Sequence, residues 1–263
     1  MINPHQILQF VRHFFSAKRN GHGIHSPYAY ALCEEVFYNE HSFYDFELLK
    51  KIREELMRNS LEVETGGFGA GSKTFQSNKR KVKDIAQRGI SSFKQSELLY
   101  KLVNYLTCNT CIELGTSLGL ITVYLAKANT SGRVISVEGS EALFNLAKGL
   151  ARESDTNNIQ FINADFDTAL PELLNEFEKI DFLYIDGNHT YEATWRYFLL
   201  ALPKLHPGSV VIFDDIYWSE GMTEVWKKIK GHPSVTLSID TFYLGLIFFR
   251  EELKEKTDLK IYL

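Results

Sequence analysis

The stretch CIELGTSLGL, residues 111–120, decides how this chain folds. It begins with a short apolar run typical of a buried strand and turns between Gly115 and Gly119. The residues that follow, ITVYLAKA, have the apolar spacing of a helix. A glycine turn that joins a strand to a helix N-terminus often binds nucleotide-like ligands, because the first N–H groups of the helix point at the ligand. The stretch therefore predicts an α/β fold with a nucleotide-like ligand at this turn.

A second glycine-rich stretch, GGFGAGSKT at residues 66–74, is one residue away from a phosphate-binding loop. Such a loop needs G-x-x-x-x-G-K-[ST], whereas Ser72 here separates Gly71 from the lysine. The segment before it, RNSLEVET, is polar, so no buried strand leads into the glycines. We expect residues 66–72 to form a flexible loop that could act as a lid over a site.

Short apolar runs recur through the second part of the chain. After CIELG come RVISVEG, IQFINAD, DFLYIDG, SVVIFDD, VTLSID and LGLIFFR, which fit strands buried on both faces. Helical spacing lies between the first five runs and again before the last two, at residues 119–128, 140–153, 168–177, 191–205 and 222–230. This repetition predicts a Rossmann-like, doubly wound α/β fold with a mostly parallel seven-stranded sheet and helices on both faces. The last two strands are expected to be an antiparallel pair at one edge.

Residues 1–95 lack this repetition and are expected to form a mainly helical extension. Helical apolar spacing occurs at residues 4–15, 28–37 and 43–57, and the basic segment SNKRKVKDIAQRGI is also expected to be a helix. The sequence thus suggests two parts. Residues 1–95 would be a helical extension with a lid or substrate segment, and residues 96–263 would be the ligand-binding domain.

The composition is that of an ordinary globular protein. The chain has 263 residues, 44% of them apolar, and its net charge of −4 gives no reason to expect a nucleic acid or an anionic membrane as partner. No apolar run approaches the roughly 20 residues of a membrane span, and the N-terminus lacks the pattern of a signal peptide. The three cysteines argue against a disulfide framework. We therefore expect a cytoplasmic protein without a membrane partner.

Almost every expected strand ends in a carboxylate. In open α/β sheets, ligands bind beyond the carboxyl ends of the strands. The carboxylates at these ends are Glu113, Glu138, Asp165, Asp186, Asp214 and Asp215. Glu138 follows the second strand, a position from which a carboxylate can accept hydrogen bonds from ribose hydroxyls. The dinucleotide pattern G-x-G-x-x-G is absent, since Ser117 and Leu120 stand where it needs glycines, and this disfavours a nucleotide-dependent oxidoreductase.

Three segments carry a resemblance to a known family, the class I S-adenosylmethionine (SAM) dependent methyltransferases. IELGTSLG is similar to the family's first motif, E-x-G-x-x-x-G; SVEGS is similar to its ribose-binding strand end, and NADF to the segment whose Asp meets the adenine amine. The resemblance covers about residues 95–250 and implies SAM as the cofactor. The residues that it assigns to cofactor binding are Glu113, Gly115, Thr116, Ser117, Gly119, Glu138, Gly139, Asp165, Phe166 and Asp186.

The second half resembles one group of that superfamily, the catechol-type O-methyltransferases and their bacterial relatives. The resemblance lies in YIDGNHTYEATWRYFLLALPKLHPGSVVIFDDIYW, residues 184–218. In that group a strand-end Asp and an acidic pair bind a divalent metal, usually magnesium, which corresponds here to Asp186, Asp214 and Asp215. His189 stands where the catechol enzymes have a lysine near the substrate hydroxyl, and Asp215 stands where they usually have asparagine.

Methyl transfer to a hydroxyl suggests roles for these side chains. The acceptor must lose its proton, which a general base or a metal ion such as Mg²⁺ can promote. We expect His189 and Asp186 to act in catalysis. Tyr217 and Trp218 are expected to line an apolar acceptor pocket. Two plainer interpretations stay open: the aspartates could cap turns and helices, and His189 could bond to a backbone carbonyl.

The expected function is SAM-dependent O-methylation of a small-molecule hydroxyl, with divalent-metal assistance as an option. RNA, such as tRNA, could be the acceptor instead, and the basic residues Lys79, Arg80, Lys81 and Lys83 could steer it. Two further functions stay open, that of a nucleotide-dependent oxidoreductase and that of a non-catalytic SAM-binding protein. The aromatic N-terminal helix could also serve as the contact surface of a homodimer.

Overall fold

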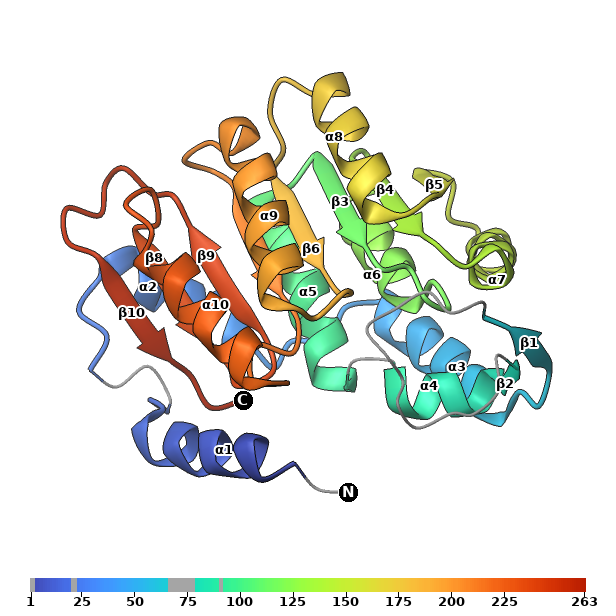
Figure 1. Ribbon diagram of the computed structural model, residues 1–263, viewed down its shortest axis with the longest axis horizontal. Coiled ribbons are helices and arrows are strands. Elements are labelled where there is room, and N and C mark those ends of the chain that lie inside the picture. The colour runs from blue at the N-terminus through green and yellow to red at the C-terminus, as the bar shows by residue number, and fades with distance from the viewer. Residues whose placement is uncertain (1–2, 20–22, 66–78, 90–91) are drawn as a thin grey trace. The chain divides into compact units, whose positions relative to one another are not determined.

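The computed structural model describes residues 3–19, 23–65, 79–89 and 92–263 (Figure 1). Contacts divide the chain into two compact units. We call Glu40–Glu172 the central unit, and Met1–Asn39 together with Leu173–Leu263 the terminal unit. The glycine-rich loop expected at residues 66–72 lies outside the described residues. The functional boundary expected near residue 95 stays a prediction.

Parallel strands form the core of the central unit. They are β3 (Thr110–Leu114), β4 (Arg133–Glu138) and β5 (Ile159–Asn163), with β4 between the other two. The side chains of β3 and β4 are buried almost throughout, whereas those of β5 are mostly half-buried. These strands confirm the first three apolar runs expected to be strands.

Helices of the central unit pack on one another and on these strands. The element α6 (Leu120–Ala128) contacts both α5 (Phe93–Leu106) and α3 (Asp45–Arg58), while α7 (Glu141–Glu153) contacts β4 and β5. All but one side chain of α6 are buried, which agrees with a helix that is apolar on every side. The next helix, α8 (Phe166–Glu176), starts directly after β5.

A short antiparallel strand pair departs from the helical extension expected over residues 1–95. The strand β1 (Glu62–Glu64) pairs with β2 (Lys79–Lys81), and α4 (Val82–Gly89) follows directly. The basic segment expected to be a helix is therefore a strand in its first part. Opposite charges face each other in this pair, since Glu62 lies opposite Lys81 and its carboxylate is 3.9 Å from the Lys81 ammonium.

The terminal unit holds the remaining strands, in the order β10-β8-β9-β7-β6. Their bounds are Phe182–Ile185 for β6, Val210–Phe213 for β7, Leu237–Asp240 for β8, Gly245–Phe248 for β9 and Thr257–Lys260 for β10. β6 and β7 are parallel, and β8 and β9 form the expected antiparallel pair. This pair is not the edge, because β10 runs parallel to β8 on its outer side. The strand β10 is one more than the sequence predicted.

Two helices of the terminal unit, α9 (Tyr191–Ala201) and α10 (Glu220–Gly231), pack against each other. The ring of Trp226 on α10 lies so close to β9 that a Cβ at Gly245 would be 2.8 Å from it. A glycine at this position therefore allows the helix to approach the strand closely.

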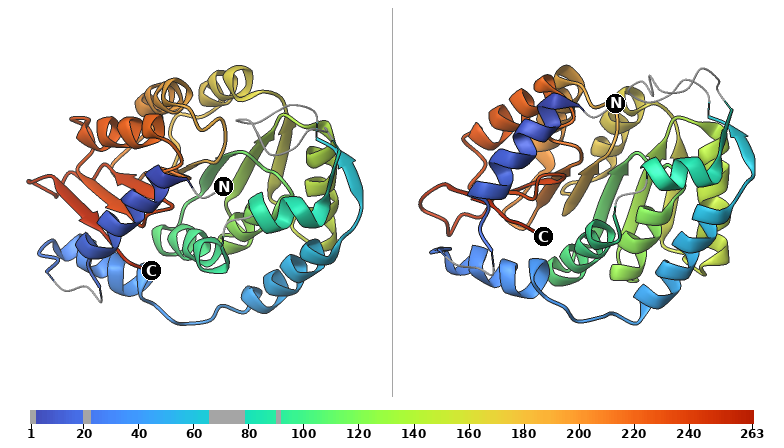
Figure 2. Two further views of the ribbon diagram at one scale, coloured as in Figure 1. Left: turned by 60° about the horizontal axis from the view of Figure 1, so that its bottom comes forward. Right: turned by 90° about the horizontal axis from the view of Figure 1, so that it is seen from below.

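The N-terminal helix α1 (Pro4–Ser16) belongs to the terminal unit and lies beside its C-terminal strands (Figure 2). After α1 the chain pairs with the end of β10: Lys18 N–H donates to Lys260 O over 2.7 Å, and Tyr262 N–H donates to Lys18 O over 3.1 Å. The α2 helix (Pro27–Leu32) continues into a short π-helix, Cys33–Phe37. No helix within the described residues is both long and apolar enough to cross a membrane.

Candidate active site

The glycine turn after β3 leads into α6, as the sequence predicted. Gly115 and Gly119 have φ angles of 110° and 82°, which glycine adopts without steric cost. A Cβ at Gly119 would also lie 2.7 Å from the Cβ of Ala147 on α7. Ser117, between the glycines, also has a positive φ of 50°. Both the backbone conformation and the contact with α7 therefore require glycine at 119.

Glu113 is fully buried beneath this turn. Its Oε2 accepts hydrogen bonds from the hydroxyls of Thr122 on α6 and Ser136 on β4, each over 2.5 Å. Thr116 in the turn is hydrogen-bonded to the same Ser136. The carboxylate thus ties the strand, the turn and the following helix together, and its expected contribution to cofactor binding stays a prediction.

Glu138, at the end of β4, binds the backbone of the same turn. Its Oε2 accepts from the N–H of Ser117 over 2.8 Å, and its Oε1 accepts from the N–H of Ser140 over 2.9 Å. Asn163 at the end of β5 donates to the backbone carbonyls of Glu138 and Gly139, over 2.7 Å and 3.2 Å. The carboxylate expected to meet the ribose is therefore held in a fixed position beside the glycine turn. Asn163 contributes to this arrangement and was not recognised from the sequence.

Asp165 caps the helix α8. Its two carboxylate oxygens accept from the N–H and the hydroxyl of Thr168, each over 2.9 Å. These hydrogen bonds hold the pKa of Asp165 below its usual value. Phe166, the first residue of α8, is half-buried. The sequence did not predict this cap, and the contacts of Asp165 and Phe166 with adenine stay predictions.

The terminal unit holds the other group of expected site residues. Asp186 follows β6, and its Oδ2 accepts a hydrogen bond from Tyr184 over 3.3 Å. His189 Nε2 lies 3.7 Å from Asp186 Oδ1, and the two side chains are only about one-fifth exposed. Asn188 between them has a φ of 48°, in the left-handed region. The imidazole and the carboxylate thus lie close together at the end of this strand, and the catalytic roles expected of them stay predictions.

Asp214 and Asp215 follow β7, whose neighbour is β6. Asp214 N–H donates to Ile185 O over 3.0 Å, which places Asp214 next to Asp186, and the two carboxyl groups share a hydrogen bond. Burial is the main cause that raises the pKa of Asp186, Asp214 and Asp215, and the neighbouring carboxyls raise that of Asp214 further. Asp215 has a φ of 53°, a conformation that Asp tolerates better than most residues.

A divalent ion would need several of these oxygens to converge. In the stretches of chain that the structure describes, no three side chains of His, Cys, Asp or Glu are grouped so that they could hold a metal ion. The paired carboxyls of Asp186 and Asp214 are instead hydrogen-bonded to each other. As placed, these donors do not form a metal site, and the magnesium site implied by the resemblance stays a prediction.

Tyr217 and Trp218, expected beside an acceptor, differ in environment. Tyr217 is buried, its ring stacks on Phe242 at 5.4 Å, and its hydroxyl donates to Asp240 Oδ2 over 2.5 Å. Burial and the adjacent Asp240 raise the pKa of Tyr217 well above its usual value. Trp218 is 46% exposed, and its ring lies 6.4 Å from that of His189. Of the two, Trp218 is the side chain that an acceptor could contact from solvent.

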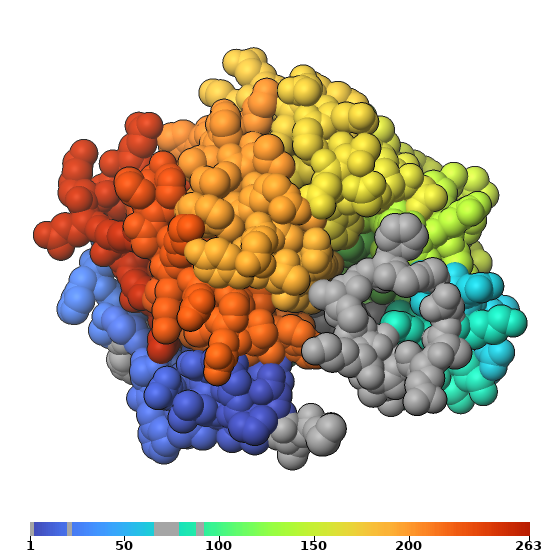
Figure 3. Space-filling model, in the orientation of Figure 1, coloured from blue at the N-terminus to red at the C-terminus, as the bar shows by residue number. Residues whose placement is uncertain are grey.

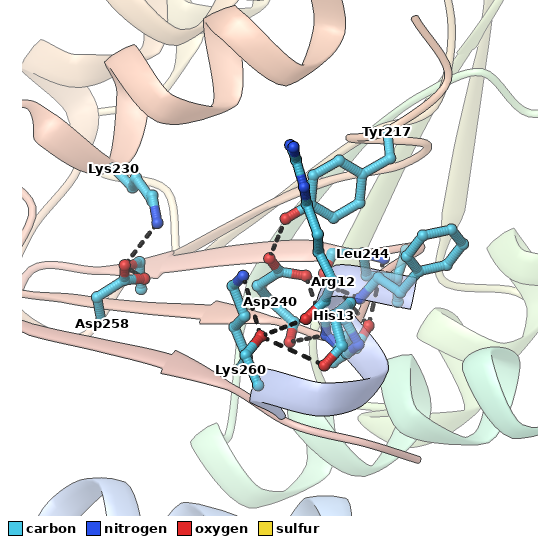
Figure 4. Close-up of polar contacts among 12 residues, drawn as sticks. Arg12, His13, Tyr217, Lys230, Asp240, Leu244, Asp258 and Lys260 are labelled. Atoms are coloured by element: carbon cyan, nitrogen blue, oxygen red, sulfur yellow. Dashed lines mark hydrogen bonds and ion pairs between the residues drawn. The ribbon is translucent and has the colours of Figure 1, made fainter. Parts of the chain in front are cut away.

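Helix α1 is anchored to this part of the terminal unit by residues that the sequence did not single out. His13 is buried, and its Nε2 lies 3.0 Å from Asp240 O and 3.3 Å from Asp240 Oδ1 (Figure 4). Asp240 thus joins His13 on α1 to Tyr217 in the loop after β7. Asn3 Nδ2 donates to Trp218 O over 3.0 Å, and His5 Nε2 is hydrogen-bonded to Thr223 Oγ1 at 2.8 Å.

The expected site residues therefore form two groups, one in each unit. The cofactor residues other than Asp186 are in the central unit around the glycine turn. The catalytic, metal and acceptor candidates, Asp186 among them, are in the terminal unit at the ends of β6 and β7.

Comparisons with known proteins find similar sequences and folds. Residues 112–216 match the family model described as "Methyltransferase domain". An uncharacterized protein of Sinorhizobium fredii is 26% identical over 170 residues, which cover 59% of this chain and 18% of that protein. A protein of Arabidopsis thaliana, provisionally named a caffeoyl-CoA O-methyltransferase, is 25% identical over 127 residues, covering 47% of this chain and 53% of that protein. The chain thus spans at most about half the length of these relatives.

Solved structures share the fold. The O-methyltransferase from Bacillus cereus, in complex with SAH, has a TM-score of 0.54 at 18% identity and covers 83% of this chain and 95% of its own. The O-methyltransferase TomG from Streptomyces achromogenes, in complex with SAM, has a TM-score of 0.56 at 17% identity and covers 84% of this chain and 95% of its own. Residues 112–216 therefore match a methyltransferase domain, and the chain shares the fold of these solved O-methyltransferases.

Proposed function

We propose that this protein transfers the methyl group of SAM to a hydroxyl oxygen of a small molecule. The observation that carries the proposal is the position of Glu138. Its carboxylate is bonded to the backbone of the glycine turn within the matched methyltransferase domain. The similar proteins of Bacillus cereus and Streptomyces achromogenes, both named O-methyltransferases, support oxygen as the acceptor atom.

In this proposal the central unit binds the cofactor. Glu138 accepts hydrogen bonds from the ribose hydroxyls, and the turn from Gly115 to Gly119 contacts the methionine end of SAM. Asp165 and Phe166, at the start of α8, bind the adenine. The buried Glu113 contributes by keeping the turn in place through Thr122 and Ser136.

Methyl transfer itself is an in-line displacement. The acceptor oxygen forms a bond to the methyl carbon while the carbon–sulfur bond breaks, and the bonding electrons leave with the sulfur of S-adenosylhomocysteine (SAH). The hydroxyl proton passes to the imidazole of His189. Since Nε2 of His189 faces Asp186, Nδ1 is the nitrogen that would accept this proton. Asp186 orients the imidazole and stabilises its positive charge, and Trp218 forms an apolar wall beside it.

A divalent ion, when bound, would lower the pKa of the acceptor hydroxyl. Asp186, Asp214 and Asp215 are the residues expected to hold it, and they do not converge as a metal site here. We therefore propose base catalysis by His189 and treat the metal as a separate prediction. Assays with and without a chelator decide between the two: a reaction that stops with the chelator and returns with Mg²⁺ would favour the metal.

An RNA acceptor has less support. Part of the basic segment forms β2, where Lys81 lies beside Glu62 instead of adding to an unbroken positive surface. The cytoplasm remains the proposed location, which fits the buried cysteines Cys33, Cys108 and Cys111, none of which is in a disulfide.

The proposed reaction is tested by transfer of a labelled methyl group from SAM to a panel of small acceptors. The panel contains phenols and aliphatic alcohols, together with the corresponding amines and thiols. We expect label in hydroxyl acceptors and formation of one SAH for each methyl group transferred. Transfer to amines or thiols alone would contradict an oxygen acceptor while keeping the methyltransferase assignment.

A further inference from the structure

Helix α1 turns its apolar side toward solvent. In the space-filling view it forms a surface of the terminal unit, coloured dark blue (Figure 3). The exposed fractions are 47% for Ile7, 49% for Leu8, 44% for Val11 and 82% for Phe15. Positions spaced by three, four and eight residues lie on one side of a helix. Large apolar side chains gathered in this way are typical of an interaction site.

The opposite side of α1 is polar, and it faces the protein. His13 is buried against Asp240, and His5 is hydrogen-bonded to Thr223. The N-cap residue Asn3 donates a hydrogen bond to the carbonyl of Trp218. Phe10 contributes an edge contact to Phe242 at 5.1 Å. Phe14 adds an edge contact to Tyr262 at 5.5 Å. Polar groups and these ring edges fix the helix to its own unit, whereas a surface helix usually packs through its apolar side.

The charge of this segment differs from that of the whole chain. No Asp or Glu occurs before Glu34, whereas Arg12, Lys18 and Arg19 are basic, in a chain with a net charge of −4. Arg12 and Arg19 are exposed. The guanidinium of Arg19 lies 4.8 Å from the ring centres of both Phe14 and Tyr262, so a cation adjoins the apolar side directly.

We propose that α1 attaches the protein to an anionic lipid surface, with the helix lying in the interfacial plane. Ile7, Leu8, Val11 and Phe15 would enter the boundary between headgroups and acyl chains, and Arg12 and Arg19 would reach the lipid phosphates. The acid-free segment is complementary in charge to such a surface. The negative net charge of the whole chain gave no reason to expect a membrane partner. The segment that contains α1 is nevertheless positively charged.

A second copy of this chain fits the same surface less well. A helix of 13 residues is only about 20 Å long, so its exposed side falls well short of the roughly 800 Å² per partner that stable interfaces bury. Two copies packed through α1 would also bring Arg12 and Arg19 of both chains close together. Lipid phosphates would neutralise these cations instead.

Binding to vesicles tests the proposal directly. The full chain is sedimented with vesicles of phosphatidylcholine alone and with vesicles in which part of this lipid is replaced by phosphatidylserine. We expect the wild type to bind the anionic vesicles and to bind the neutral ones weakly. Vesicle binding needs neither SAM nor an acceptor, so it can succeed or fail independently of the proposed methyl transfer.

The apolar contribution is measured with the double variant Val11→Ser/Phe15→Ser. Its partition into anionic vesicles should fall at least about tenfold, because two apolar side chains no longer leave water. The matched control is Tyr44→Ser/Leu61→Ser, which removes side chains that are 98% and 53% exposed in the central unit. The control should bind like the wild type, and thermal unfolding should verify that both variants are folded.

The cationic contribution is measured with Arg12→Gln/Arg19→Gln. Its partition should fall about thirtyfold, because each cation near an anionic surface contributes a factor of about five, and added salt should likewise weaken wild-type binding. Failure of the wild type to bind anionic vesicles would overturn the proposal, as would unchanged binding by the Val11→Ser/Phe15→Ser variant. A dimer in solution that this variant converts to a monomer would assign the surface to a second copy instead.

Discussion

The two groups of site residues differ in how their charges are balanced. Around the glycine turn, Glu113 and Glu138 each accept two hydrogen bonds from neighbouring groups, and Asp165 has a lowered pKa because of its bonds to Thr168. At the ends of β6 and β7, burial raises the pKa of Asp186 and Asp214, and the carboxyls of Asp186 and Asp215 raise that of Asp214 further. In the first group the protein itself donates hydrogen bonds to the carboxylates, whereas the second group would gain from a proton or a cation.

This difference suggests a division of labour. When a site is already ordered, little conformational entropy is lost as the ligand binds. Such a site suits the binding of a cofactor, which stays the same whichever acceptor is methylated. Buried carboxyls with a raised pKa beside an imidazole are typical of sites that move protons. Each of the following substitutions removes one part of this difference between the two groups.

The largest effect is expected from Glu138→Ala. This change removes a buried carboxylate that both fixes the turn and is proposed to bind ribose, so SAH affinity should fall at least about a hundredfold. Calorimetric titration measures it. Glu141→Ala is the control, because Glu141 is an exposed carboxylate three residues further on. Equal affinity of Glu138→Ala and the control would disprove the ribose role.

A comparable loss, in rate rather than in affinity, is expected from His189→Gln. Without the imidazole the acceptor hydroxyl lacks its proposed base, and kcat should fall about a hundredfold or more. SAH affinity should stay within about twofold of the wild type, since His189 lies in the terminal unit. If kcat is unchanged while SAH affinity falls, His189 belongs to cofactor binding and the contrast between the groups is wrong.

A smaller effect is expected from Gly119→Ala. The new Cβ would meet Ala147 at 2.7 Å and would occupy a backbone with φ of 82°, so the free energy of unfolding should fall by about 1–3 kcal/mol. Urea unfolding measures this loss. Adding Ala147→Gly should restore part of it, because the clash is relieved while the backbone strain remains; Ala147→Gly alone is the control. If the free energy of unfolding of Gly119→Ala equalled that of the wild type, the turn would not be rigid.

The smallest effect is expected in the acid dependence of stability. Burial opposes ionisation of Asp240, but hydrogen bonds from His13, Tyr217 and the N–H of Phe242 outweigh it and hold its pKa below the usual value. A lowered pKa in the folded state stabilises the protein above the unfolded pKa of about 3.9, and this contribution is lost as the pH falls through the folded pKa.

Thermal unfolding from neutral to acid pH measures this dependence. The wild type should lose stability at the acid end, and Asp240→Asn should be less stable at neutral pH and show a flatter acid limb. An acid limb of equal steepness in both proteins would mean that Asp240 does not hold α1 to the terminal unit in the way described.

The sequence predicted best what is encoded locally. CIELGTSLGL carries the apolar run, the glycines and the helix start within ten residues, and the structure confirms the resulting strand, turn and helix. The helix α5 could also have been recognised, because Ser92 and Gln95 have the spacing of a capping box and form one. The strand β10 gave no such signal. Its sequence TDLK is half charged, and its pairing with β8 depends on the tertiary fold.

Contacts between distant residues were beyond the sequence. His13 and Asp240 are separated by 227 positions. The residues around each of them in the sequence therefore do not predict that the two side chains are in contact. Tyr217 was expected beside an acceptor because of its place after the acidic pair, but its hydroxyl is bonded to Asp240 and its side chain is buried. Residue type and spacing can suggest which side chains carry chemistry, whereas burial and partners depend on the packing of the whole unit.

Calorimetric titration of SAH into the full chain tests the central claim most directly. The cofactor residues of the central unit are already held in place by internal hydrogen bonds, so we expect about one SAH bound per chain, equally with Mg²⁺ and with excess chelator. A protein that is folded but binds no SAH under either condition would contradict the methyltransferase function proposed for this fold.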